Sequence, residues 1–184
     1  KAFELLKEIR DYSEIPISIM LSYNLAYQHG LDSFYKKCHD LKIDAILFPD
    51  LPLEESDEVM QYSKKYSIDQ IFMVSQITSE ARLEKMAKLC SGYVYLVSRL
   101  GTTGTREKLN SNLKKLIEKT KRYFNIPIYV GFGISKPEHV QKVFTIGANG
   151  VIIGSAISRI IEENHANKIK MIENLSNFLS SLKT

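Results

Sequence analysis

Apolar residues in this chain follow two patterns that alternate from one end to the other. In the first, apolar residues stand almost side by side, which is typical of a parallel strand buried on both faces. In the second, they recur every three or four positions, as on one face of a helix. We predict strands at residues 15–21, 43–48, 70–75, 93–98, 126–130 and 151–153. We predict helices at residues 2–10, 31–41, 54–66, from 78 or 79 to 90, and at 113–124, 136–146, 156–163 and 169–182.

Strictly alternating strands and helices form a parallel sheet with right-handed crossovers. Such a sheet is either open and doubly wound or closed into a barrel. An open dinucleotide-binding sheet carries its glycine turn after the first strand, whereas the glycine turns of this chain come late. The sequence therefore favours an α/β fold of the (β/α)8 TIM-barrel type.

The last two predicted strands each end in a glycine turn that leads into a helix. The first turn contains Gly131, Phe132 and Gly133, and the second contains Gly154 and Ser155. Glycine lets backbone N–H groups approach an oxyanion, and a helix start adds a partial positive charge. The loops after strands 7 and 8 are the usual phosphate site of such barrels. We predict that these two turns bind a phosphate group. The plainer alternative, that the glycines only end buried strands, stays open.

The predicted units do not complete a barrel. A closed barrel of this type needs eight βα units and roughly 250 residues, whereas six units are predicted in these 184 residues. No linker or change of composition indicates a second domain. We expect residues 1–184 to be one barrel domain with six of its eight units present, the first two being absent, and we expect the chain as given to be inactive by itself.

Composition narrows the classes of function. No apolar run approaches the roughly 18 to 20 residues of a membrane span, and residues 1–6 resemble an amphipathic helix rather than a signal peptide. We therefore expect a cytoplasmic protein without a membrane partner. Cys38 and Cys90 are expected as reduced thiols, and the four His residues lack metal-ligand spacing. The net charge of +4 suits an anionic substrate, while dispersed lysines argue against nucleic acid.

Four residues have a structural interpretation beside a functional one. Asp50 lies in a turn between two prolines, where a structural or interface role is favoured over catalysis. Tyr95 is either core filling or a pocket residue whose hydroxyl meets a substrate hydroxyl. Thr103 is either an ordinary loop residue or part of a closing loop. Phe132 lies between two glycines, and this position favours contact with a ligand over a place in the core. We also predict that Ser135 and Glu138 form a capping box.

Four motifs, taken in order and spacing, resemble the tryptophan synthase alpha subunit family over the whole chain. They are Leu-Phe-Pro-Asp-Leu-Pro-Leu-Glu-Glu at 47–55, Ser-Arg-Leu-Gly-Thr-Thr-Gly at 98–104, Gly-Phe-Gly-Ile-Ser at 131–135 and Val-Ile-Ile-Gly-Ser-Ala at 151–156. The resemblance implies a carbon-carbon lyase of tryptophan biosynthesis that cleaves indole-3-glycerol phosphate to indole and glyceraldehyde 3-phosphate. It implies no cofactor on this subunit. Indole would pass to a beta subunit that carries pyridoxal phosphate, in an alpha2-beta2 complex.

The resemblance also assigns roles to individual residues. The phosphate would be held by Gly104, Gly133, Gly154 and Ser155. The indole and glycerol pocket would be lined by Leu47, Tyr95, Phe132 and Ile152, with Thr103 on a lid. The beta subunit would face Asp50 and Pro52. Ser22 and Thr102 stand where the family commonly has Tyr and Val, which leaves the detail of the pocket wall and lid open.

The family's catalytic pair is not expected in this chain. Its Glu and Asp belong to units that would precede Lys1, so no catalytic residue is assigned here. Two alternatives stay open. One is another phosphate-binding barrel, of the phosphoribosylanthranilate isomerase or prenyl-glyceryl phosphate synthase type, which resembles the chain only around the last two turns. The other is a catalytically silent partner that activates a beta subunit.

Overall fold

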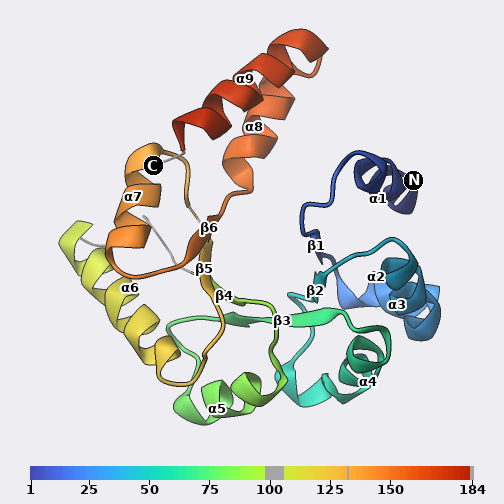
Figure 1. Ribbon diagram of the computed structural model, residues 1–184. Coiled ribbons are helices and arrows are strands. Elements are labelled where there is room, and N and C mark those ends of the chain that lie inside the picture. Colours follow the sequence, from blue (N-terminus) through green and yellow to red (C-terminus); the bar gives the residue numbers. More distant parts are fainter. Residues whose placement is uncertain (98–105, 132, 183–184) are drawn as a thin grey trace. The chain divides into compact units, whose positions relative to one another are not determined.

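The computed structural model describes residues 1–97, 106–131 and 133–182, with side chains for all of these except 106–111. The described chain forms two compact units. The first contains Lys1–Met73 and Glu84–Tyr93, and the second contains Val74–Leu83 and Val94–Thr184. Each unit is a parallel βα arrangement (Figure 1). That residues 1–184 form a single domain stays a prediction.

The first unit contains three parallel strands with helices between them. Its elements are α1 Ala2–Tyr12, β1 Ser18–Met20, α2 Tyr23–His29, α3 Leu31–Asp40, β2 Ala45–Leu47, the 3-10 helix η1 Leu53–Glu55, α4 Asp57–Tyr66, β3 Asp69–Val74 and the end of α5 Glu80–Leu89. β2 pairs with both β1 and β3, so that Met20, Leu47 and Ile71 lie at one level. The predicted strands are therefore present, although β1 and β2 are shorter than the apolar runs that revealed them.

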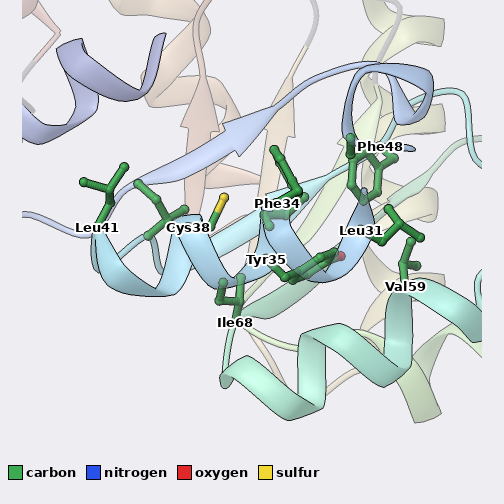
Figure 2. Close-up of a cluster of buried hydrophobic side chains, with 11 residues drawn as sticks. Leu31, Phe34, Tyr35, Cys38, Leu41, Phe48, Val59 and Ile68 are labelled. Carbon is green, nitrogen blue, oxygen red and sulfur yellow. The ribbon is translucent and has the colours of Figure 1, made fainter. Parts of the chain in front are cut away.

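The core of the first unit lies between the strands and α3 (Figure 2). The predicted apolar face of α3 is confirmed. Leu31, Phe34, Tyr35, Cys38 and Leu41 are all buried. Phe34 and Tyr35 are joined edge to face, with ring centroids 5.8 Å apart.

The core also contains two buried polar side chains that pair with each other. The Tyr35 hydroxyl donates to Oε1 of Gln70 at 2.9 Å, which pairs two polar groups inside an apolar cluster. Burial raises the pKa of the Cys38 thiol to about 12, and Cys38 and Cys90 are both free, as predicted.

The second unit repeats the plan with the last three strands. Its elements are β4 Val94–Val97, α6 Arg106–Lys121, β5 Ile128–Gly131, α7 Pro137–Thr145, β6 Gly150–Ile152, α8 Ser155–Asn164 and α9 Lys168–Ser181. β5 pairs in parallel with β4 and with β6. α8 and α9 lie side by side (Figure 1). α6 begins seven residues before the predicted start at 113, because its polar first turns carry no apolar period.

Two local predictions were wrong. No helix was predicted between residues 21 and 31, yet α2 Tyr23–His29 lies there. The capping box of Ser135 and Glu138 does not form. Pro137 is the first residue of α7 and forces an extended backbone on Lys136, which becomes the N-cap with φ −144°. The Ser135 backbone N–H instead donates to Nδ1 of His139 at 3.3 Å.

Asp50 explains the start of α2. Its Oδ2 accepts from the Ser22 hydroxyl at 2.5 Å, and its Oδ1 accepts from the backbone N–H of Tyr23 at 2.8 Å. The turn after β2 therefore anchors the helix that follows β1. These two hydrogen bonds hold the pKa of Asp50 below its usual value of 3.8, and the bond from the Ser22 hydroxyl has the larger effect.

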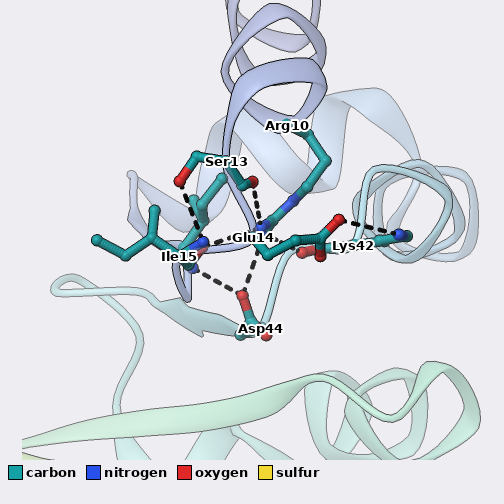
Figure 3. A network of polar contacts seen from close by, with 7 residues as sticks. Arg10, Ser13, Glu14, Ile15, Lys42 and Asp44 are labelled. Carbon is teal, nitrogen blue, oxygen red and sulfur yellow. Dashed lines mark hydrogen bonds and ion pairs between the residues drawn. The ribbon is translucent and has the colours of Figure 1, made fainter.

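A second anchor lies before β1 and β2 (Figure 3). Nη1 of Arg10 donates to the carbonyls of Ser13 and Ile15 at 3.1 and 2.9 Å. Its Nη2 donates to the Lys42 carbonyl at 2.5 Å and meets Oδ2 of Asp44 at 3.3 Å. The Arg10 side chain is only 10% exposed. One guanidinium thus ties the segment before β1 to the segment before β2.

We expect Arg10→Lys to destabilise the full-length protein by about 2 kcal/mol, because a single ammonium cannot serve carbonyls on both segments. Urea unfolding followed by circular dichroism measures the change. Arg122→Lys, at an exposed position after α6, is the matched control and should be nearly neutral. Equal effects of the two substitutions would contradict an anchoring role for Arg10.

We expect Asp50→Ala to lower the free energy of unfolding at pH 7 by about 1 kcal/mol, since the first turn of α2 loses its acceptor. A carboxyl whose folded pKa is lowered stabilises the fold above its unfolded pKa and loses that effect as pH falls through the folded value. The difference from the parent protein should therefore shrink below about pH 4.

Denaturation at pH 7 and at pH 3 measures this difference. The control is Asp11→Ala, which removes an exposed aspartate for which the described part of the chain offers no hydrogen bond. A loss at Asp50 that did not change with pH would show that the carboxylate charge is not what holds α2.

Candidate active site

The turns after β5 and β6 contain the glycines and the helix start on which the predicted anion site depends. Gly133 adopts a φ of +85°, which favours glycine, and it is exposed. Gly154 is the N-cap of α8, and Ser155 is the first residue of that helix. Both are exposed. A Cβ built at Gly154 would find no atom of the described residues within 4 Å.

The start of α8 also has suitable electrostatics. Gly154 offers no side-chain cap, and the first turn of α8 contains no acidic residue. The first N–H groups of a helix have no partner within the helix and carry the positive end of its dipole. An oxyanion placed at Gly154 and Ser155 would satisfy those groups.

The strands of the second unit have two different faces, and both end at these turns. Val94, Leu96, Ile128 and Val130 are fully buried on the helix-covered face. On the other face, Tyr95 and Ile152 are half-buried. Tyr95 therefore points away from the helices.

The Tyr95 ring lies over Gly131 on the neighbouring strand. A Cβ at Gly131 would come within 2.5 Å of Cζ and 2.8 Å of Cε1 of that ring. Because Gly131 pairs with Val97, the ring leans across one strand and two residues toward the strand ends. This tilt carries the tyrosine hydroxyl toward the glycine turns.

Leu47 belongs to the first unit. It is 1% exposed, and its neighbours Ile46 and Phe48 both belong to the cluster against α3. Successive side chains of a strand point to opposite faces, so Leu47 lies on the face away from α3. This is the face that a barrel turns inward.

The two predicted interface residues lie in the turn after β2. Both are exposed, and Pro52 is the N-cap of η1. Both carboxylate oxygens of Asp50 already accept hydrogen bonds. The preference for a structural role over a catalytic one is therefore supported by a specific pair of contacts. The Ser22 partner was missed because no local spacing connects residues 28 apart.

Three predicted site residues, Thr103, Gly104 and Phe132, lie outside the described residues. Within the described part of the chain, no group of three His, Cys, Asp or Glu side chains could hold a metal ion. The same residues contain no helix long and apolar enough to cross a membrane. The described residues therefore offer a helix start without an acidic side chain in its first turn, beside a partly apolar face of the sheet.

Comparison with known families adds a whole-chain match. The family model of the tryptophan synthase alpha chain matches residues 1–184. The alpha chain of Methanoregula boonei is 42% identical over 181 residues, covering 98% of this chain and 68% of that protein. The alpha chain of Methanocaldococcus jannaschii is 44% identical over 165 residues, covering 89% and 58%.

Solved structures agree with the sequence matches. The tryptophan synthase a2b2 complex of Pyrococcus furiosus contains a chain that superposes with a TM-score of 0.88 at 35% identity, covering 98% of this chain and 72% of that one. The alpha subunit of Campylobacter jejuni superposes with a TM-score of 0.86 at 32% identity, covering 96% and 69%. The predicted (β/α)8 architecture, with six parallel strands present, is confirmed.

A match from the first residue to the last sets aside the alternative of another phosphate-binding barrel, which rested on the last two turns alone. The chain belongs to the tryptophan synthase alpha chain family, whose members are indole-3-glycerol-phosphate lyases.

Proposed function

We propose that this chain binds the phosphate of indole-3-glycerol phosphate at the turns after β5 and β6. The observation that carries the proposal is the glycine at position 154. Its φ of −118° suits any residue, and a Cβ there would meet no atom of the described part of the chain within 4 Å. A ligand that must approach the backbone gives a reason for glycine at this place.

The aromatic and glycerol part of the substrate would lie along the inward faces of the strands. Tyr95 and Ile152 supply that surface in the second unit, while the role of Leu47, in the first unit, stays a prediction from the resemblance. Gly133 and Ser155 complete the phosphate contacts, while Gly104, Phe132 and Thr103 stay predictions from the resemblance. The apolar faces would orient the ring and exclude water from it.

Aldol cleavage of this substrate requires a base for the glycerol hydroxyl and an acid for the ring carbon. Asp50 is a poor candidate because both of its oxygens are engaged. We therefore assign binding and orientation to the residues of this chain, and the proton transfers to the family's Glu and Asp. The family needs no cofactor on the alpha chain, and pyridoxal phosphate sits on the beta subunit.

The Pyrococcus furiosus relative is described as part of an a2b2 complex. By extension, we propose that a beta subunit docks on the turn that carries Asp50 and Pro52. Its support is exposure at a strand end, together with the rigidity that the Asp50 anchor gives to this turn. The proposal also includes a cytoplasmic location and a single barrel domain for residues 1–184, both in keeping with the family.

We expect Gly154→Asp to abolish binding of glycerol phosphate by the full-length protein, because a carboxylate would occupy the site and repel the anion. Gly154→Ala is the matched control, since among residues 1–97, 106–131 and 133–182 its methyl group meets no atom within 4 Å. It should leave stability unchanged and weaken binding to a smaller extent. Isothermal calorimetry measures both. If the affinity of Gly154→Asp for glycerol phosphate were unchanged, the assignment of the phosphate site to this turn would be wrong.

We expect Pro52→Ala to weaken association with the beta subunit about tenfold, with little effect on cleavage by the free alpha subunit. Sedimentation and steady-state assays of the full-length protein measure the two effects. Pro127→Ala is the control, because this exposed proline precedes a strand instead of following one. An undiminished complex with Pro52→Ala would place the partner face elsewhere.

A further inference from the structure

The turn after β5 is bound by a histidine that no assignment above uses. His139 is the third residue of α7, and its Nδ1 accepts from the backbone N–H of Ser135 at 3.3 Å. In a capping box, the side chain at the third helical position accepts from the N–H of the N-cap residue. Here the N-cap is Lys136. The acceptor therefore reaches one residue further back, into the turn that contains Gly133.

This contact defines the state of the imidazole. A backbone N–H can only donate, so Nδ1 carries no proton and the ring proton lies on Nε2. His139 is half-buried, whereas Ser135 is exposed. The imidazole thus serves the turn as a hydrogen-bond acceptor. A side chain without an acceptor at this position could not replace it.

The turn benefits from such a contact because of its glycine. Gly133 is exposed and has a φ of +85°, and glycine loses more conformational freedom on ordering than any other residue. Two contacts directly after it restrict that freedom. The Ile134 side chain is buried and ties the turn to the core, and His139 holds the N–H group of the following residue. Gly133 is therefore ordered before a ligand arrives.

We propose that His139 is a positioning residue for phosphate binding, which keeps Gly133 in its binding conformation by holding Ser135. This inference rests on the proposed phosphate site. A turn that is ordered in advance loses less entropy when its ligand binds, and affinity rises accordingly. The effect is on binding and not on proton transfer, because His139 acts through the backbone of the turn.

The test compares variants of the full-length protein by calorimetry with glycerol phosphate. His139→Leu removes the acceptor, and the affinity should fall about fivefold, which matches the usual contribution of one hydrogen bond. His139→Asn is the conservative variant. Its Oδ1 is bonded to Cγ, as Nδ1 of histidine is, so the affinity should stay within about twofold of that of the parent protein.

Thr145→Val is the matched control for a general weakening of α7. It removes the hydrogen bond from the Thr145 hydroxyl to the Gln141 carbonyl, at the other end of the same helix. The affinity for glycerol phosphate should be unchanged in this variant. If His139→Leu fails to fold, His139→Ala decides the question with the same measurements.

Steady-state cleavage of indole-3-glycerol phosphate provides a second readout. The loss of an interaction that is equal in the ground state and the transition state raises KM and leaves kcat unchanged. His139→Leu should therefore raise KM about fivefold at constant kcat, and His139→Asn should restore KM. A fall in kcat with unchanged KM would contradict a role in binding.

The outcomes separate this inference from the proposed function. If His139→Leu lowered the melting temperature and left the affinity for glycerol phosphate unchanged, His139 would only stabilise α7, and the inference would be wrong. A loss of affinity that His139→Asn did not restore would overturn it as well. If Gly154→Asp lost binding as expected while His139→Leu behaved as the parent protein, only the positioning role would be wrong. If Gly154→Asp still bound glycerol phosphate, the phosphate site itself would be wrong.

Discussion

The pairing register of the parallel strands decides which side chains can meet in this protein. A strand alternates between two faces, so a slip of one residue would move Tyr95 and Tyr129 to the helix side and Leu96 and Val130 to the inward side. The helix-covered face prevents that slip, because Val94, Leu96, Ile128 and Val130 are fully buried and cannot exchange with tyrosines. The core on one face therefore positions the site on the other.

Contacts at both ends of the strands hold this arrangement in the first unit. Before the strands, the Arg10 guanidinium joins the segments that lead into β1 and β2. After the strands, Asp50 joins the turn of β2 to the helix that follows β1. Both anchors use backbone groups as partners, so they fix the course of the chain and not only the side chains. A turn that is fixed in this way presents its exposed residues at little further cost in entropy when a partner binds.

The sequence predicted the features that depend on local pattern. Apolar runs located the strands, and the face of α3 from Leu31 to Leu41 was read correctly, because burial imposes a period that survives in the residue types. α2 was missed because it is short and the acceptor for its first turn, Asp50, lies far along the chain. The capping box at Ser135 was wrong because Pro137 shifted the helix start by one residue.

The same division holds for the candidate site. The glycine turns after β5 and β6 were visible in the sequence, since glycine before a helix start is a local signal. The contact between His139 and Ser135 was not visible, because the sequence indicated a capping box of Ser135 with Glu138 instead. Family resemblance supplied the remaining assignments, and it supplies none for His139.

Most of the described glycines are explained by the fold itself, either by their backbone angles or by a side chain packed against them. Gly154 is not explained in this way. Among the described glycines, Gly30, Gly92, Gly133 and Gly147 have positive φ angles. Gly131 and Gly150 have ordinary backbones, but tyrosine rings occupy the space of a Cβ. Gly154 has neither reason, because its φ is −118° and no atom that the structure describes would lie within 4 Å of a Cβ there. The described part of the fold would tolerate alanine at this position, and this is why we propose that a ligand approaches the start of α8 from outside the chain.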